Sequence, residues 1–120
     1  MNICTRRSPL LAILCLFLTT WHSHGQDTPR TIEVHAKRFS FSPAEITITK
    51  GEKVTLILTT EDVAHSLAIP SLHVNKEITK GHPATVEVTS DKVGDFAGKC
   101  GRFCGSGHGS MLFMVHVKDN

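Results

Sequence analysis

The sequence contains no tyrosine and a single tryptophan, and its charges of opposite sign nearly cancel. The tryptophan is Trp21, so residues 26–120 contain neither of these aromatic residues. Thirteen Lys and Arg face 11 Asp and Glu, and charged residues make up 20% of the chain. This balance excludes a strongly basic nucleic-acid binder and a highly charged disordered chain. A length of 120 residues with 40% apolar content fits one domain and excludes two independent ones.

Long apolar runs are also scarce, and the one clear run lies near the N-terminus. Arg6 and Arg7 precede the apolar residues 10–18, and a polar stretch follows at 21–25. That order is typical of a secretory signal peptide, and the run is about half of the roughly 20 residues that span a bilayer. We therefore predict that residues 1–25 are a signal peptide and that residues 26–120 form an exported domain. The predicted location is periplasmic or extracellular, without a stable membrane span after signal removal.

Three alternatives for the N-terminus remain open. The apolar run is an uncleaved anchor in the first alternative. In the second, Cys15 is a lipid attachment site, although the bulky Leu14 before it argues against a lipobox. In the third, residues 5–7 belong to a twin-arginine signal, which would allow export of a domain already folded around a cofactor.

Cysteine is scarce in the predicted exported domain. Of the four cysteines, Cys4 and Cys15 fall in the predicted signal peptide, which leaves Cys100 and Cys104. A framework of several disulfides is thereby excluded. Because unprotected thiols tend to oxidise outside the cytoplasm, this pair forms either an ordinary disulfide or part of a metal site.

Apolar and polar residues alternate with a period of two along several short segments, which is typical of strands with one buried face. We predict strands at 31–37, 45–50, 54–59, 84–89 and 111–117. Turn signals separate them at 42–43, 50–52, 81–83 and 90–91. Because no amphipathic helix is evident, the sequence predicts an all-β fold, either a β-sandwich or a small Greek-key barrel.

The chemistry concentrates in one glycine-rich segment, where Cys100, Cys104, His108 and Met111 have the spacing C-x3-C-x3-H-x2-M. Thiolate and thioether are soft ligands and imidazole is intermediate, a combination that suits copper better than calcium or magnesium. Glycine allows such a loop to fold tightly around an ion. A further ligand should come from elsewhere, and His65, in a polar turn after a predicted strand, is the best candidate.

Three segments together resemble the copper-A (CuA) domain of cytochrome c oxidase subunit II, a cupredoxin. They are Asp62-Val63-Ala64-His65-Ser66, Ile69-Pro70-Ser71-Leu72 and the loop from Cys100 to Met111, and the resemblance covers residues 32–117. It implies a cupredoxin-like Greek-key β-sandwich that binds two copper ions per chain. It also implies that Cys100 and Cys104 bridge both ions, that His65 and His108 bind one ion each, and that Met111 and the backbone carbonyl of Arg102 are weak ligands.

The sequence departs from this family at several points. Arg102 replaces a residue that is usually acidic, although the family uses its backbone carbonyl, and Leu67 stands where an aromatic residue is common. The transmembrane hairpin of oxidase subunits is missing, and so is the aromatic cluster that receives electrons, because residues 26–120 lack Trp and Tyr. These departures predict a stand-alone copper protein rather than a working oxidase subunit.

Two functional hypotheses from different classes use the same ligands. In the first, the protein passes single electrons between redox partner proteins; in the second, it is a copper chaperone that delivers copper to an exported or respiratory enzyme. A third interpretation is a mononuclear, blue-copper-like site with one cysteine. Since no open coordination position, general base or nucleophile is evident, we predict that the protein is not an enzyme. Nothing in the sequence specifies an oligomeric state or a nucleic-acid partner.

Several residues around the motif have predicted secondary roles. Asp62 either orients His65 through a hydrogen bond or is a solvated turn carboxylate. Lys99 and Arg102 flank the motif and either dock an acidic partner or are simply solvated. We interpret Met114 as a core residue, and four other histidines as surface or strand residues: His35, His73, His82 and His116.

Overall fold

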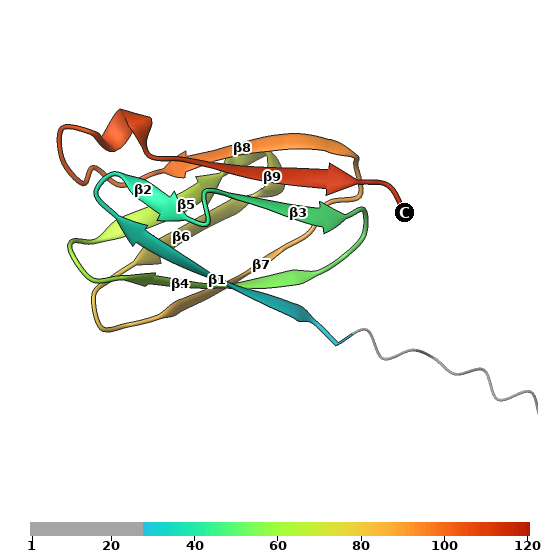
Figure 1. Cartoon of the computed structure of the whole chain (residues 1–120), viewed down its shortest axis with the longest axis horizontal. Coiled ribbons are helices and arrows are strands. Elements are labelled where there is room, and N and C mark those ends of the chain that lie inside the picture. Colours follow the sequence, from blue (N-terminus) through green and yellow to red (C-terminus); the bar gives the residue numbers. More distant parts are fainter. Residues whose placement is uncertain (1–27) are drawn as a thin grey trace, which may run out of the picture.

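The computed structural model describes residues 28–120. The predicted signal peptide, with Cys15 and the twin-arginine segment, lies outside the described residues. Within 28–120 the chain forms nine strands and two short 3₁₀ helices (Figure 1). None of the helices in this range is long and apolar enough to cross a membrane.

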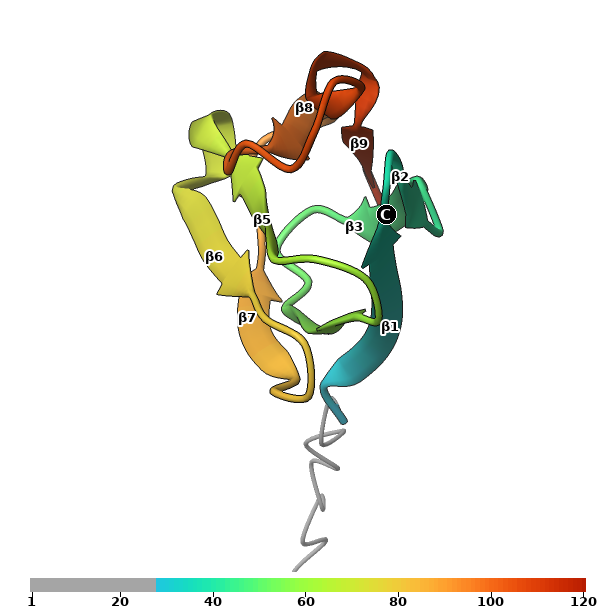
Figure 2. The same ribbon diagram turned by 90° about the vertical axis from the view of Figure 1, so that its left-hand side faces the viewer.

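Two β-sheets pack face to face as a sandwich, which Figures 1 and 2 show from two sides. One sheet has the order β2-β1-β4-β7 and is made of β1 (Arg30–Lys37), β2 (Ser40–Ser42), β4 (Val54–Thr60) and β7 (Ala84–Val88). The other has the order β3-β9-β8-β5-β6 and is made of β3 (Glu45–Thr49), β5 (His65–Ile69), β6 (Val74–Ile78), β8 (Gly94–Cys100) and β9 (Leu112–Lys118). The 3₁₀ helices are η1 (Pro70–Leu72) and η2 (His108–Ser110). The predicted all-β sandwich is confirmed.

The five predicted strands correspond to β1, β3, β4, β7 and β9, each to within one residue at either end. Four further strands, β2, β5, β6 and β8, were not predicted. The burial along β5 is continuous, with four of five residues buried, so the alternation that marks a half-buried strand is missing. In β6 three consecutive exposed residues hide the pattern, and β2 is only three residues long.

Two predictions about the local structure of site residues are wrong. His65 was expected in a polar turn, but it is the first residue of β5 and is fully buried. Cys100 was expected on the glycine-rich loop, but it is the last residue of β8 and is also buried. Pairing between β5 and β8, with Leu67 opposite Cys100, makes both segments extended. The loop itself therefore begins one residue later than expected.

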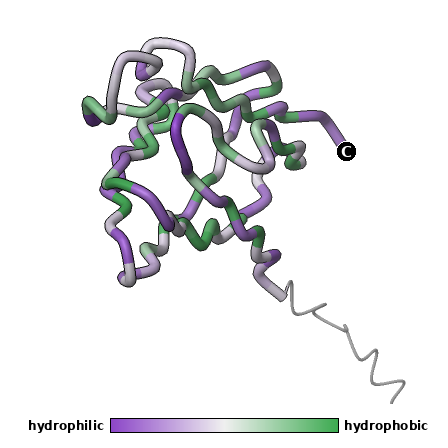
Figure 3. The backbone as a smooth tube through the Cα atoms, turned by 60° about the vertical axis from the view of Figure 1, so that its left-hand side comes forward, coloured by the Kyte–Doolittle hydropathy of each residue, from purple (hydrophilic) through white to green (hydrophobic). Residues whose placement is uncertain are grey.

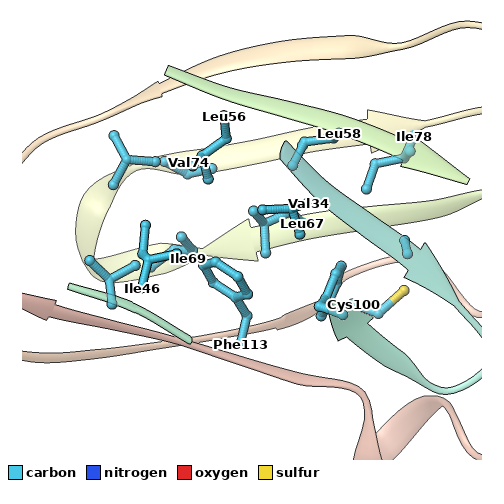
Figure 4. Close-up of a cluster of buried hydrophobic side chains, with 14 of the residues drawn as sticks. Val34, Ile46, Leu56, Leu58, Leu67, Ile69, Val74, Ile78, Cys100 and Phe113 are labelled. Carbon is cyan, nitrogen blue, oxygen red and sulfur yellow. The ribbon is translucent and has the colours of Figure 1, made fainter. Parts of the chain in front are cut away.

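The hydrophobic core lies between the two sheets and extends to the end of β8. Val34, Leu56 and Leu58 enter it from one sheet, and Leu67 and Phe113 from the other (Figure 4). Hydrophobic and hydrophilic residues alternate along the strands, as the colours of Figure 3 show. Cys100 lies at one end of this core cluster in Figure 4 and is 1% exposed. At least one thiol of the motif is therefore held by core packing.

The second half of β9 alternates as well, which corrects one prediction. Phe113, Val115 and Val117 are buried, whereas Met114 is half-buried on the opposite face of the strand. Met114 is therefore not a core residue as predicted. His116 shares its face, and His35, His73 and His82 are exposed, so the interpretation of these four histidines as surface or strand residues is confirmed.

His116 joins three strands of the larger sheet. Its Nδ1 lies 2.6 Å from Oδ1 of Asp95 on β8, and its Nε2 lies 3.2 Å from Oε2 of Glu45 on β3. Hydrogen bonds to these two carboxylates, Asp95 first, raise the pKa of His116 above its ordinary value. The folded protein therefore binds a proton here more tightly than the unfolded chain does.

This raised pKa predicts a pH-dependent stability. The contribution of His116 should be complete below its unfolded pKa of about 6.5 and should disappear as the pH rises through the higher folded pKa. In urea unfolding of the metal-free protein, the free-energy advantage of the wild type over His116→Gln should shrink between about pH 6 and pH 9. His82→Gln, at an exposed turn, is the control and should show no such trend. An advantage for His116 that is constant over this range would contradict the prediction.

Candidate metal centre

The predicted site residues meet at one end of the sandwich, the end that faces the viewer in Figure 2. Here β5 begins at His65, β8 ends at Cys100, and the loop of residues 101–111 with η2 returns to β9. Backbone hydrogen bonds close this loop at its base, from the N–H of Cys100 to the carbonyl of Met111. The fold thus brings together segments that are 35 residues apart in the chain.

The two thiols lie side by side, and each has an imidazole next to it. The Sγ atoms of Cys100 and Cys104 are 3.9 Å apart. Nδ1 of His65 lies 3.9 Å from Sγ of Cys100, and Nδ1 of His108 lies 3.7 Å from Sγ of Cys104. The ligand atoms of His65, Cys100 and Cys104 all lie within 4.8 Å of one another. The pair is free, not a disulfide.

The two remaining predicted residues each place one further possible ligand atom beside a thiol. The backbone carbonyl oxygen of Arg102 lies 3.0 Å from Sγ of Cys100. The thioether Sδ of Met111 lies 3.9 Å from Sγ of Cys104. All six residues of the predicted ligand set therefore gather in one place, and their assignment as ligands stays a prediction.

Most of this donor set is shielded from water. His65 and Met111 are 0% exposed, Cys100 is 1% exposed and Cys104 is 6% exposed, whereas His108 is half-buried. Met111 lies just after η2, one residue before β9 begins, and not inside the final strand as expected. The half-buried imidazole of His108 is thus the side of the cluster nearest to solvent.

Two glycines allow the loop to pack against the aromatic ring of Phe39. A Cβ at Gly107 would lie 2.3 Å from Cδ2 of that ring, and a Cβ at Gly105 would lie 2.9 Å from Cε1 and Cζ of the same ring. Gly105 also has a φ of +139°, which side chains rarely adopt. A larger residue at either position would clash with this ring.

A hydrogen bond to Asp62 determines which nitrogen of His65 faces the thiols. Nε2 of His65 lies 2.8 Å from Oδ1 of Asp62, which confirms the predicted hydrogen bond. Because a carboxylate only accepts, Nε2 carries the proton and Nδ1 presents its lone pair to Cys100. The hydroxyl of Thr60 and the N–H of Val63 donate to the same oxygen, at 2.9 and 2.6 Å.

The pKa values of Asp62 and Cys104 are shifted in opposite directions. Burial alone would raise the pKa of Asp62, but hydrogen bonds from the N–H of Arg38, from His65 and from Val63 together hold it well below its usual range. Burial, followed by the neighbouring thiol of Cys100, raises the pKa of Cys104. Asp62 is therefore a fixed anion, whereas a metal must displace a proton from Cys104.

The donor set fits copper. Soft sulfur and borderline imidazole donors are typical of copper sites, and the cluster of possible metal ligands found within residues 28–120 consists of His65, Cys100 and Cys104, without a carboxylate of the kind that calcium prefers. A first-row metal bonds a thiolate at about 2.3 Å. Since the two sulfurs are 3.9 Å apart, one ion can contact both.

Among the charged residues around the site, one was not predicted, and two were predicted to dock a partner. Arg38, whose Nε donates to the carbonyl of Cys104 at 3.0 Å, was not predicted, because nothing in the sequence links it to the motif. The guanidinium of Arg102 forms an ion pair with Glu77. Lys99 is exposed on β8. A docking role for Lys99 and Arg102 stays a prediction.

Residues 9–112 match the family model described as Cupredoxin-like domain, and the chain therefore belongs to the cupredoxin-like family. Its relatives include cytochrome c oxidase subunit 2 proteins. The chain is 41% identical over 68 residues to the probable cytochrome c oxidase subunit 2 of Streptomyces coelicolor, covering 57% of this chain and 21% of that protein. It is 29% identical over 89 residues to the subunit 2 of Thermus thermophilus, covering 74% of this chain and 66% of that protein.

A solved structure shows the same fold. The periplasmic domain of subunit II of cytochrome oxidase from Bradyrhizobium japonicum matches with a TM-score of 0.69 and 19% identity, covering 76% of this chain and 85% of that one. The resemblance to oxidase subunit II that the motif indicated is thus confirmed. The chain spans only about a fifth of the length of the Streptomyces relatives.

Proposed function

We propose that this protein is an exported electron-transfer protein with a CuA-type pair of copper ions. The observation that carries the proposal is that the possible ligand atoms fall into two similar groups, one around each thiol. Cys100 has His65 and the carbonyl of Arg102 beside it, and Cys104 has His108 and Met111 beside it. Each half offers one imidazole and one weak donor, and the two thiolates lie between them.

The spacing of the sulfurs is compatible with two ions. An ion at about 2.3 Å from both sulfurs cannot lie on the line that joins them, because half of their 3.9 Å separation is shorter than that bond. Each thiol has an imidazole on its own side, so His65 and His108 would each be available to a separate ion. A blue-copper-like site with one cysteine would leave the second buried thiol without a role.

Copper ions held by Cys100, Cys104, His65 and His108 would supply one-electron chemistry. The chain contributes a rigid surround. His65 and Cys100 lie on paired strands in a close-packed core, and Asp62 keeps Nδ1 of His65 directed at the thiols. Since these side chains have little freedom to move, the ligands would need little reorganisation when the charge of a bound metal changes.

The alternative of a copper chaperone differs in metal exchange. A donor needs ligands that an acceptor can reach, but His65, Cys100 and Met111 are each at most 1% exposed. This burial favours retention of the metal and therefore favours an electron carrier over a copper donor. We propose the periplasm as its location, on the basis of the predicted signal peptide and of the periplasmic structural relative.

The test is copper stoichiometry together with electron paramagnetic resonance of the loaded protein. We expect two coppers per chain and one unpaired electron shared equally by two nuclei. One copper with a single-nucleus spectrum would contradict the proposal in favour of a mononuclear site. Rapid loss of copper to a chelator added in modest excess would favour the chaperone.

Met111→Leu should keep both coppers but shift the reduction potential. Leucine nearly matches the volume of methionine, so this buried position should lose less than about 1.5 kcal/mol, while the weak thioether donor disappears. Voltammetry and copper analysis measure the two effects. Met114→Leu, on the opposite face of β9, is the matched control and should leave the potential unchanged. Complete loss of copper from Met111→Leu would show that Met111 is a principal ligand.

A further inference from the structure

The turn between β1 and β2 lies at the same end of the sandwich as the donor set (Figure 1). Arg38 and Phe39 form this turn. Arg38 contacts both of the segments that carry the ligands, the one that contains Asp62 and His65 and the one that contains Cys104 and His108. None of the motifs in the sequence includes it.

The backbone of Arg38 holds the His65 side. Its N–H donates to Oδ2 of Asp62 at 2.7 Å, while Oδ1 of the same carboxylate accepts from Nε2 of His65 at 2.8 Å. Both carboxylate oxygens are thus used, one by the turn and one by the imidazole. The turn therefore helps to orient the His65 ring through a carboxylate that Thr60 and Val63 also hold.

The side chain of Arg38 holds the Cys104 side. Its Nε donates to the carbonyl oxygen of Cys104 at 3.0 Å, across 66 residues of sequence. The next residue, Phe39, packs beneath Gly105 and Gly107 in the same loop. Cys104 lies four residues beyond the end of β8, where sheet pairing no longer restrains the chain, so this hydrogen bond replaces the missing strand partner.

We propose that Arg38 is a positioning residue that ties the two ligand segments together and keeps the thiol of Cys104 at the correct distance from the His65 side before metal binds. The expected consequence is slow copper release, and in this respect the inference rests on the proposed copper function. The hydrogen bond is directional, from Nε, and the charge of the side chain alone cannot supply it. Lysine at this position would keep the charge but would place a methylene group where Nε now donates, so this bond would be lost.

The experiment compares Arg38→Met and Arg38→Lys with the wild type, and uses Lys37→Met as the control. Lys37 is the exposed neighbour of Arg38, and no side-chain hydrogen bond from it is found within residues 28–120. Each substitution at 38 removes only the side-chain contact, because the backbone N–H to Asp62 remains. The measurements are the rate of copper release to a chelator, the electron paramagnetic resonance spectrum, and hydrogen exchange of residues 101–111 in the metal-free protein.

We expect both variants at 38 to release copper about tenfold faster, the lower end of the effect of losing a partner of a ligand. Their spectra should change, their loop amides should exchange faster, and Lys37→Met should behave as the wild type. A wild-type release rate and spectrum in Arg38→Met, or full rescue by Arg38→Lys, would overturn the proposal.

The metal-free measurement separates this inference from the proposed function. If the wild type binds no copper, the proposed function fails, and the exchange data alone then judge the role of Arg38. Faster exchange in both Arg38 variants but not in Lys37→Met would still support a tie between the two segments. Unchanged exchange in that case would overturn it.

Discussion

Replacing Cys104 by serine should abolish the proposed copper pair and leave at most one weakly held copper per chain. The thiol at this position lies 3.9 Å from the thiol of Cys100, 3.7 Å from Nδ1 of His108 and 3.9 Å from Sδ of Met111, so it is the centre of the donor set. A hydroxyl is a hard, weakly acidic group and does not replace a bridging thiolate on copper. The copper affinity should fall by more than about 100-fold, beyond the effect of losing a partner of a ligand.

The measurement is copper per chain by metal analysis, with the electron paramagnetic resonance spectrum of the same sample. Ser106→Ala, at an exposed position of the same loop, is the control and should keep both coppers. Urea unfolding of the metal-free variants checks that Cys104→Ser still folds. Two coppers per chain with an unaltered spectrum in Cys104→Ser would disprove the bridging role.

Phe113→Ala should cause the largest loss of stability among single core substitutions, about 3–5 kcal/mol in the free energy of unfolding. The ring is 1% exposed and lies between the sheets, edge-on to Phe41 with centroids 5.7 Å apart and planes at 76°. Truncation leaves a cavity and removes this aromatic contact. Because Phe113 follows Met111 by two residues, it also restrains the end of the ligand loop.

The adjacent residue provides a matched control. Leu112 lies on the outer face of β9 and is 59% exposed, so Leu112→Ala should change the unfolding free energy by no more than about 0.5 kcal/mol. Urea unfolding of both metal-free variants at one pH measures the difference. If Phe113→Ala lost less than about 1 kcal/mol, the core would have to collapse around the missing ring, and the rigid surround proposed for the metal site would be in doubt.

The sequence predicted the strands that have one face in the core and one in water. In β1, β4 and β9 this arrangement leaves a period of two that any reader of the sequence can find. The sequence did not predict β5 and β8, which lie inside the larger sheet near the ligand cluster. Ser66 is buried next to His65, so polarity no longer reports exposure there, and the glycines of β8 resemble a loop.

The ligand cluster was predictable to the extent that it is local in the chain. Cys100, Cys104, His108 and Met111 lie within one short segment, and their chemistry indicates copper without any knowledge of the fold. His65 entered through its own local motif, and its hydrogen bond to Asp62 spans only three residues. Arg38 could not be found in this way, because its contact with Cys104 crosses 66 residues and depends on where two loops meet.

The amino-acid sequence by itself determined the class of fold and the kinds of atom that are available to a metal, since strand period and ligand softness are properties of residue types and spacing. Only the tertiary structure decided that His65 begins a buried strand, that its Nδ1 faces Cys100, and that Arg38 reaches Cys104. These arrangements depend on which strands pair and how closely two sheets pack, and those choices are made by the whole chain at once.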